Sequence, residues 1–94
     1  MSNLRFVWDP AKARGNQAKH GVSFDEAVTA FHDENAKVFT DPDHSQEEDR
    51  FILLGMSFRL RVLVVCHCYR ESETVVRIIS VRKADGEERE NYWR

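Results

Sequence analysis

The stretch Val62-Leu63-Val64-Val65-Cys66-His67-Cys68-Tyr69, residues 62–69, decides the fold. Its first five residues are apolar at both alternating positions, a pattern typical of a strand that is covered on both faces. Two further runs rich in β-branched and apolar residues lie before and after it, at Phe51–Met56 and Val75–Arg82, with short connections between them. The three runs predict a β-meander in which residues 62–69 form the central strand.

Capping signals predict three helices around this meander. The first begins at Pro10 after Asp9 and ends at Gly21. The second begins with a capping box formed by Ser23 and Glu26 and runs to about Phe31. The third begins at Asp85, which forms a capping box with Glu88. Short strands at Leu4–Trp8 and Lys37–Thr40 complete the order β-α-α-β-β-β-β-α. We expect a single α+β domain over residues 1–94, in which helices pack on one face of an antiparallel sheet.

The composition excludes several classes of protein. A chain of 94 residues and 11.0 kDa has room for one small core. With 41% hydrophobic and 32% charged residues, it is too apolar for a disordered chain and too charged for a membrane protein. Because neither a signal peptide nor a spanning segment is found, we expect a cytoplasmic location, in which Cys66 and Cys68 stay reduced.

The net charge of −2 hides an uneven distribution. Residues 33–49 hold seven acids and one lysine, so the rest of the chain carries 13 bases and 9 acids, a net charge of +4. Basic residues also outnumber acidic ones between Arg59 and Lys83. Such a region can attract phosphates, although an ordinary mixed surface gives the same composition.

The loop lengths of the meander predict a row of side chains across three strands. If Met56 faces Arg61 and Tyr69 faces Val75, then Arg50, His67 and Arg77 lie side by side on one face of the sheet. A shift of one residue would turn members of this row to opposite faces. An arginine within an apolar strand, such as Arg77, is costly to bury without an anion. The anion is either a carboxylate of the same chain, for instance Glu48 or Glu71, or a phosphate that it binds through two hydrogen bonds. Alternatively, the guanidinium extends to the sheet edge and stays in solvent.

His67 is the candidate general base of this row. Two neighbouring arginines would disfavour its charged form, and a neutral imidazole can accept a proton. We predict no metal or cofactor, because adjacent strand positions point to opposite faces and Cys66-His67-Cys68 therefore cannot converge on one ion. Neither a Gly-rich phosphate loop, a nucleophile elbow nor an H-E-x-x-H motif is present.

Four segments in order resemble one known family over nearly the whole chain. They are Phe6-Val7-Trp8-Asp9, Lys19-His20-Gly21-Val22-Ser23-Phe24 with Glu26-Ala27, Asp41-Pro42-Asp43-His44-Ser45 with Glu48 and Arg50, and Arg77-Ile78-Ile79-Ser80-Val81-Arg82-Lys83-Ala84. Together they resemble the BrnT-type toxins of bacterial type II toxin–antitoxin systems. The chain departs from the family pattern at Leu60, where glycine is expected, and at Val81, where alanine is usual.

The resemblance implies a RelE-like fold and a metal-independent ribonuclease that arrests translation. It also implies a BrnA-type antitoxin as partner. The antitoxin would bind the operator DNA, and the toxin would reach this DNA only through the antitoxin. A non-catalytic module that binds RNA or protein is the alternative.

From side-chain chemistry and the predicted register we assign catalysis to His67, Arg77, Arg50 and Glu48. We assign RNA binding to Arg59, Arg61, Arg82, Lys83, Lys12, Lys19 and His20. The general acid stays open among Glu48, His20, Lys83 and Tyr92.

Overall fold

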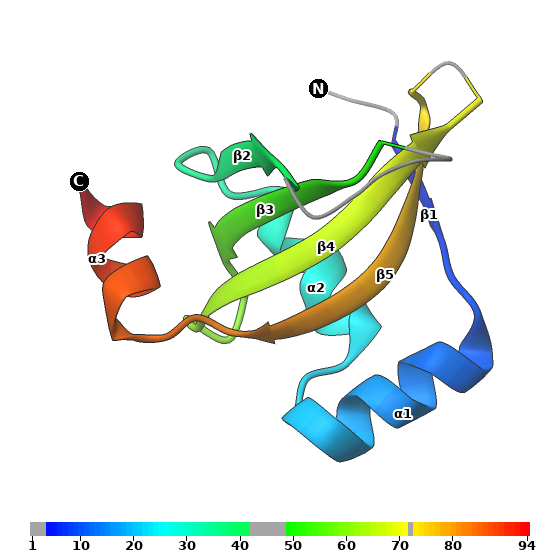
Figure 1. The fold of residues 1–94 in the computed structure, drawn as a ribbon, viewed down its shortest axis with the longest axis horizontal. Coiled ribbons are helices and arrows are strands. Elements are labelled where there is room, and N and C mark those ends of the chain that lie inside the picture. Colours follow the sequence, from blue (N-terminus) through cyan, green and yellow to red (C-terminus); the bar gives the residue numbers. More distant parts are fainter. Residues whose placement is uncertain (1–3, 42–48, 72) are drawn as a thin grey trace.

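The structure is a computed structural model that describes residues 4–41, 49–71 and 73–94. Its sheet has five strands in the order β1-β5-β4-β3-β2, with three helices around it (Figure 1). The strands are β1 (Arg5–Val7), β2 (Lys37–Thr40), β3 (Phe51–Met56), β4 (Val62–Arg70) and β5 (Val75–Lys83), and the helices are α1 (Pro10–His20), α2 (Phe24–Ala30) and α3 (Gly86–Trp93). The predicted element order and the central place of β4 are confirmed.

The sheet is mixed, so the prediction of a purely antiparallel sheet was wrong. β2, β3, β4 and β5 are antiparallel neighbours, but β1 pairs with β5 in parallel, with Phe6 opposite Val76. The first and last strands of the sequence therefore lie side by side. Local sequence patterns mark β1 as a strand but do not determine its direction, which depends on how α1 and α2 return the chain to the sheet.

The helices lie on both faces of the sheet, which corrects the prediction that they pack on one face. Leu53, Leu63 and Val65 belong to one core cluster with residues of α2, including Ala27 and Ala30. Their neighbours of opposite parity form a second cluster with Tyr92 of α3, comprising Leu54, Val62, Val64 and Ala84. Because consecutive strand residues point to opposite faces, the apolar run in β4 is buried between α2 and α3.

A side chain of α1 completes the free edge of the sheet beside β5. Asn16 lies in the interior of the helix and is buried. Its amide nitrogen donates to the carbonyl of Val81 at 2.9 Å and to that of Val22 at 3.1 Å, and its amide oxygen accepts from the N–H of Val81 at 3.0 Å. The side-chain amide thus replaces the peptide of a neighbouring strand where β1 no longer pairs with β5.

None of the helices formed by the described residues has the length and apolar character needed to cross a membrane. The expected likeness to the RelE fold stays a prediction.

We predict that Asn16→Ala lowers the free energy of unfolding by roughly 2–4 kcal/mol, because it leaves one buried N–H and two carbonyls without their partner. Urea denaturation followed by circular dichroism measures the change. Gln17→Ala is the matched control on the exposed side of α1 and should change the free energy of unfolding by less than about 0.5 kcal/mol. Equal effects of the two substitutions would show that the amide of Asn16 does not support the sheet edge.

Candidate functional site

The strand register differs by one residue from the predicted one. Met56 lies opposite Val62, not Arg61, and Val75 lies opposite Arg70, not Tyr69. The pairing of β4 with β5 also shifts between Cys66 and His67, where β5 holds an extra residue. The predicted row of Arg50, His67 and Arg77 therefore does not form.

Cys68 takes the place predicted for His67 between the two arginines. Arg77 of β5 lies opposite Cys68, and continuing the β3–β4 register by one residue from the pair Phe51–His67 places Arg50 on the other side of Cys68. The backbone of Arg50 continues the pairing of β3 with β2, because its carbonyl accepts a hydrogen bond from the N–H of Asp41 at 2.9 Å. With strands about 4.8 Å apart, the backbones of the two arginines are separated by about 10 Å.

This row lies on the α3 side of the sheet. Arg77 shares its parity with Val75 and pairs with Cys68, whereas Val76 and Ile78 point into the α2 core. We refer to the cross-strand residues Arg50, Cys68 and Arg77 as the arginine row.

Arg77 is half-buried, and within the part of the chain that the structure describes its guanidinium has no hydrogen bond or ion pair. Its neighbours in the sheet are Cys68 and, on β1, Val7, which offer it no carboxylate. A guanidinium in such a place is stabilised by an anion, and phosphate fits its paired N–H donors.

His67 lies on the opposite face of the sheet and has no exposed surface. Its ring packs edge-on against Phe31 and Tyr69, with centroids 4.9 Å and 5.3 Å away. Nδ1 is 3.1 Å from the carbonyl of Val65 and must donate to it, so Nε2 carries the lone pair and has no partner among the described residues.

Burial lowers the pKa of His67, and the hydrogen bond to Val65 opposes this only in part. The imidazole is therefore neutral, as the sequence predicted, but the cause is loss of solvation and not the positive charge of neighbouring arginines. The role of His67 as general base stays a prediction, and the enclosed ring gives it no direct contact with a substrate.

We predict that His67 makes the fold less stable in acid. The pKa of His67 in the folded chain lies below the ordinary value of 6.5. The neutral imidazole therefore makes its full contribution to the free energy of unfolding above pH 6.5, and this contribution is lost as the pH falls toward the folded pKa. The free energy of unfolding should fall by up to about 1.4 kcal/mol per pH unit from this group. His67→Phe keeps an aromatic ring among Phe31, Phe51 and Tyr69 and should remove this part of the slope.

Urea denaturation of both proteins between pH 7.5 and 5 measures the difference, in which carboxylates common to both chains cancel. Identical slopes would contradict the assignment.

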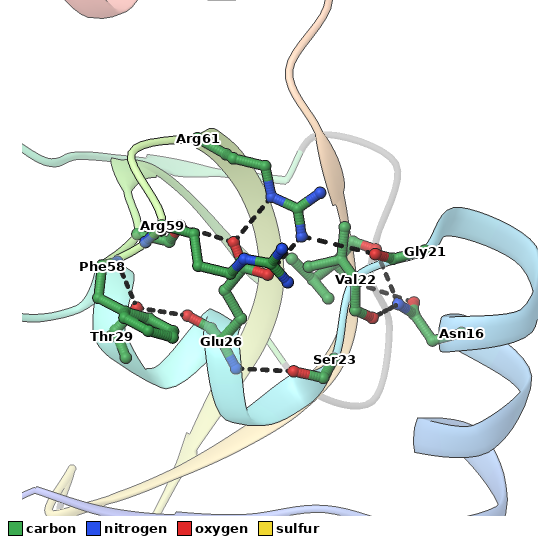
Figure 2. A network of polar contacts seen from close by, with 11 residues as sticks. Asn16, Gly21, Val22, Ser23, Glu26, Thr29, Phe58, Arg59 and Arg61 are labelled. Carbon is green, nitrogen blue, oxygen red and sulfur yellow. Dashed lines mark hydrogen bonds and ion pairs between the residues drawn. The ribbon is translucent and has the colours of Figure 1, made fainter.

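Glu26 is the centre of a polar network between α2 and the β3–β4 turn (Figure 2). The carboxylate is 3% exposed and accepts two hydrogen bonds from the guanidinium of Arg61 and one from the hydroxyl of Ser57 at 2.6 Å. These bonds, that of Arg61 foremost, hold the pKa of Glu26 below its ordinary value although burial raises it. Ser23 caps α2 as predicted, but Glu26 faces Arg61 instead of closing the capping box.

A second arginine predicted to bind RNA is also paired. Arg82 donates two hydrogen bonds of 2.8 Å to Glu88, which also accepts from the N–H of Asp85 in the predicted capping box of α3. The hydrogen bonds from Arg82 lower the pKa of Glu88 and correspondingly raise that of Arg82. Arg61 and Arg82 thus have internal carboxylate partners and are less available to RNA than Arg77.

The remaining predicted residues are spread over the surface. Lys12 and Lys19 are exposed on α1, and His20 is its half-buried last residue. Lys83 is exposed at the end of β5, and Arg59 is exposed in the β3–β4 turn. Glu48 lies outside the described residues.

Tyr92, one of the residues considered as the general acid, is buried and donates its hydroxyl to Asp33. Burial, with the neighbouring carboxylate of Asp33, raises its pKa to about 12. Its proton is therefore held in an internal hydrogen bond. In the described ranges no group of three or more His, Cys, Asp and Glu side chains is arranged to hold a metal ion.

Comparison with known proteins identifies the family. Residues 8–88 match the family described as "Ribonuclease toxin, BrnT, of type II toxin-antitoxin system". The chain belongs to the BrnT family. It is therefore a ribonuclease toxin of a type II toxin–antitoxin system, and its partner is an antitoxin. A search of curated proteins found no significant match.

A solved BrnT structure has the same architecture. The Brucella abortus ribonuclease toxin BrnT, determined at 1.1 Å, superposes with a TM-score of 0.66 at 25% sequence identity. The match covers 87% of this chain and 97% of the Brucella chain. The sequence resemblance to BrnT toxins is thus confirmed by both comparisons.

Sequence reasoning missed two residues that shape this BrnT chain. Asparagine is unfavourable in the interior of a helix, and Asn16 lies in the interior of α1. This was the available signal that its side chain hydrogen-bonds to the sheet edge. Cys68 had no such signal, because its place between two arginines depends on the register.

Proposed function

We propose that this BrnT-family toxin cleaves RNA without a metal ion, arrests translation in the cytoplasm, and is neutralised by a BrnA-type antitoxin that also binds the operator DNA. The family assignment supports the ribonuclease class. Arg77, which is half-buried on the α3 side of the sheet and has no carboxylate partner among the described residues, is the observation that carries the proposed site.

Metal-independent cleavage uses the 2′-hydroxyl of the RNA as nucleophile. Its oxygen bonds to the adjacent phosphorus while a base takes its proton, and the bond to the 5′-oxygen of the next nucleotide breaks as that oxygen gains a proton. The products are a 2′,3′-cyclic phosphate and a 5′-hydroxyl end. Negative charge grows on the phosphate oxygens in the transition state, so positioned cations accelerate the step.

The arginine row supplies such cations. Arg77 can bind the scissile phosphate through two parallel N–H groups, and Arg50 is close enough, at about 10 Å between backbones, for its long side chain to reach the same phosphate or the next one. Arg82 lies on the same face of β5, about 16 Å along the strand from Arg77, but its guanidinium is paired with Glu88.

A non-catalytic module that binds RNA or protein remains the second candidate, because Arg77 would also hold a phosphate that is not cleaved. Analysis of the products separates the two. Intact RNA recovered after long incubation with tightly bound protein would favour the binding module.

We predict that Arg77→Ala lowers kcat/KM for RNA cleavage by roughly 10²-fold or more, because a cation is lost from the developing charge. Arg77→Lys should retain part of the activity, since it keeps the charge but not the paired donors. Arg14→Ala on the exposed side of α1 is the control and should cleave like the parent chain. An unchanged rate for a folded Arg77→Ala protein would remove the arginine row from the site.

The chemistry itself gives another prediction. A 2′-deoxy sugar at the cleaved nucleotide should abolish cutting, because the nucleophile is missing, whereas EDTA should leave the rate unchanged. Gel analysis of labelled oligonucleotides measures both. Cleavage of the deoxy substrate, or inhibition by EDTA that added metal reverses, would contradict the mechanism.

Translation arrest is tested separately. Expression without an antitoxin should stop incorporation of labelled amino acids before it stops RNA synthesis.

A further inference from the structure

The β3–β4 turn presents two large apolar side chains to solvent. Phe58 is 70% exposed and Leu60 is 79% exposed, more than any other large hydrophobic residue in the described ranges. Arg59 stands between them and is also exposed. We call Phe58, Arg59 and Leu60 the turn tip.

Leu60 has a conformation that disfavours leucine. Its φ of 63° lies in the left-handed region, where glycine has no steric penalty and a side chain does. The other non-glycine residues with positive φ among the described residues, Glu71 and Glu73, have charged side chains that water solvates. Leu60 gains neither burial nor solvation, so its side chain does nothing for the isolated fold.

The turn tip is held in place by hydrogen bonds from its backbone. The N–H of Leu60 donates to the carbonyl of Ser57 at 2.9 Å, and the N–H of Phe58 donates to the hydroxyl of Thr29 at 2.9 Å. That hydroxyl in turn donates to the carbonyl of Glu26 at 2.7 Å, so the turn is fastened to α2 (Figure 2). An apolar surface fixed in advance loses little conformational entropy when a partner binds.

The charge beside the turn tip is positive. Figure 2 shows the side chain of Arg59 running past the carboxylate of Glu26, which Arg61 already binds on its other side. Arg59 is near enough to lower the pKa of Glu26, after the larger effect of Arg61, but its guanidinium forms no hydrogen bond or ion pair with any described residue. Two guanidinium groups thus share one carboxylate, and a second carboxylate would complement them.

We propose that the turn tip is a docking site for the antitoxin, which inserts apolar side chains around Phe58 and Leu60 and a carboxylate beside Arg59. The identity of the partner rests on the proposed function. The position of the docking site is inferred from Leu60, which is strained and exposed.

Other occupants fit the turn tip less well. RNA would use Phe58 for stacking and Arg59 for a phosphate, but it gains nothing from a strained aliphatic Leu60. A second copy of this chain would bring one Arg59 against another and meet like charge. A protein segment with apolar and acidic residues satisfies all three side chains.

Titration of the purified toxin with the antitoxin encoded by the adjacent reading frame tests the proposal. Leu60→Gly removes the apolar side chain and relieves the backbone, so the variant should fold at least as stably as the parent and cleave RNA at the same rate. Its Kd for the antitoxin should rise about tenfold or more. Leu60→Asn, which also tolerates a positive φ, should behave in the same way.

Trp93→Ala is the matched control, since Trp93 is 68% exposed but lies on α3. Its Kd should stay within about twofold of the parent value. An unchanged Kd for Leu60→Gly would overturn the proposal, as would an equal loss of antitoxin affinity in Trp93→Ala. If Leu60→Gly binds RNA more weakly but binds the antitoxin normally, the proposal is also overturned. If the parent chain cleaves no RNA, the proposed function fails, but the titration still reports on the turn tip.

Discussion

The pairing of β4 with β5 is the constraint on which the rest of the structure depends. β4 is the central strand and β5 is its neighbour, and the shift between Cys66 and His67 sets which of their side chains point to each helix. Before the shift, Val65 and Val81 face α2, and after it His67 and Ile78 do so. The same shift puts Cys68, and not Tyr69, opposite Arg77. Since a one-residue slip reverses a strand's faces, both the core and the candidate site follow from this pairing.

Internal carboxylates neutralise some of the cations and leave others available. Glu26 binds Arg61, and Glu88 binds Arg82, with each carboxylate also helping to hold a turn or a helix start. Arg77 has no such partner within the described chain, and it stands on the sheet face that α3 covers only in part. The basic stretch seen in the sequence therefore contains structural arginines, Arg61 and Arg82, and also Arg77, which can bind a phosphate.

The helix boundaries could be predicted because their signals are local. Asp9, Ser23 and Asp85 each accept a backbone N–H at the start of a helix, and Gly21 ends α1 with a φ of 72°. The register could not be predicted, because it depends on turn conformation. Leu60 adopts a left-handed conformation where its side chain gives no sign of one, and the resulting turn pairs Met56 with Val62.

The amino-acid sequence by itself determined the elements, their order, the central place of β4 and the BrnT family, because periodicity, caps and family motifs are properties of short segments. Only the tertiary structure decided the parallel direction of β1, the faces covered by α2 and α3, the burial of His67 and the partners of Arg61 and Arg82. The physical reason is that these depend on pairing and packing between residues far apart in the chain. A single residue of strand offset moves a charged or titratable group between the core and the solvent.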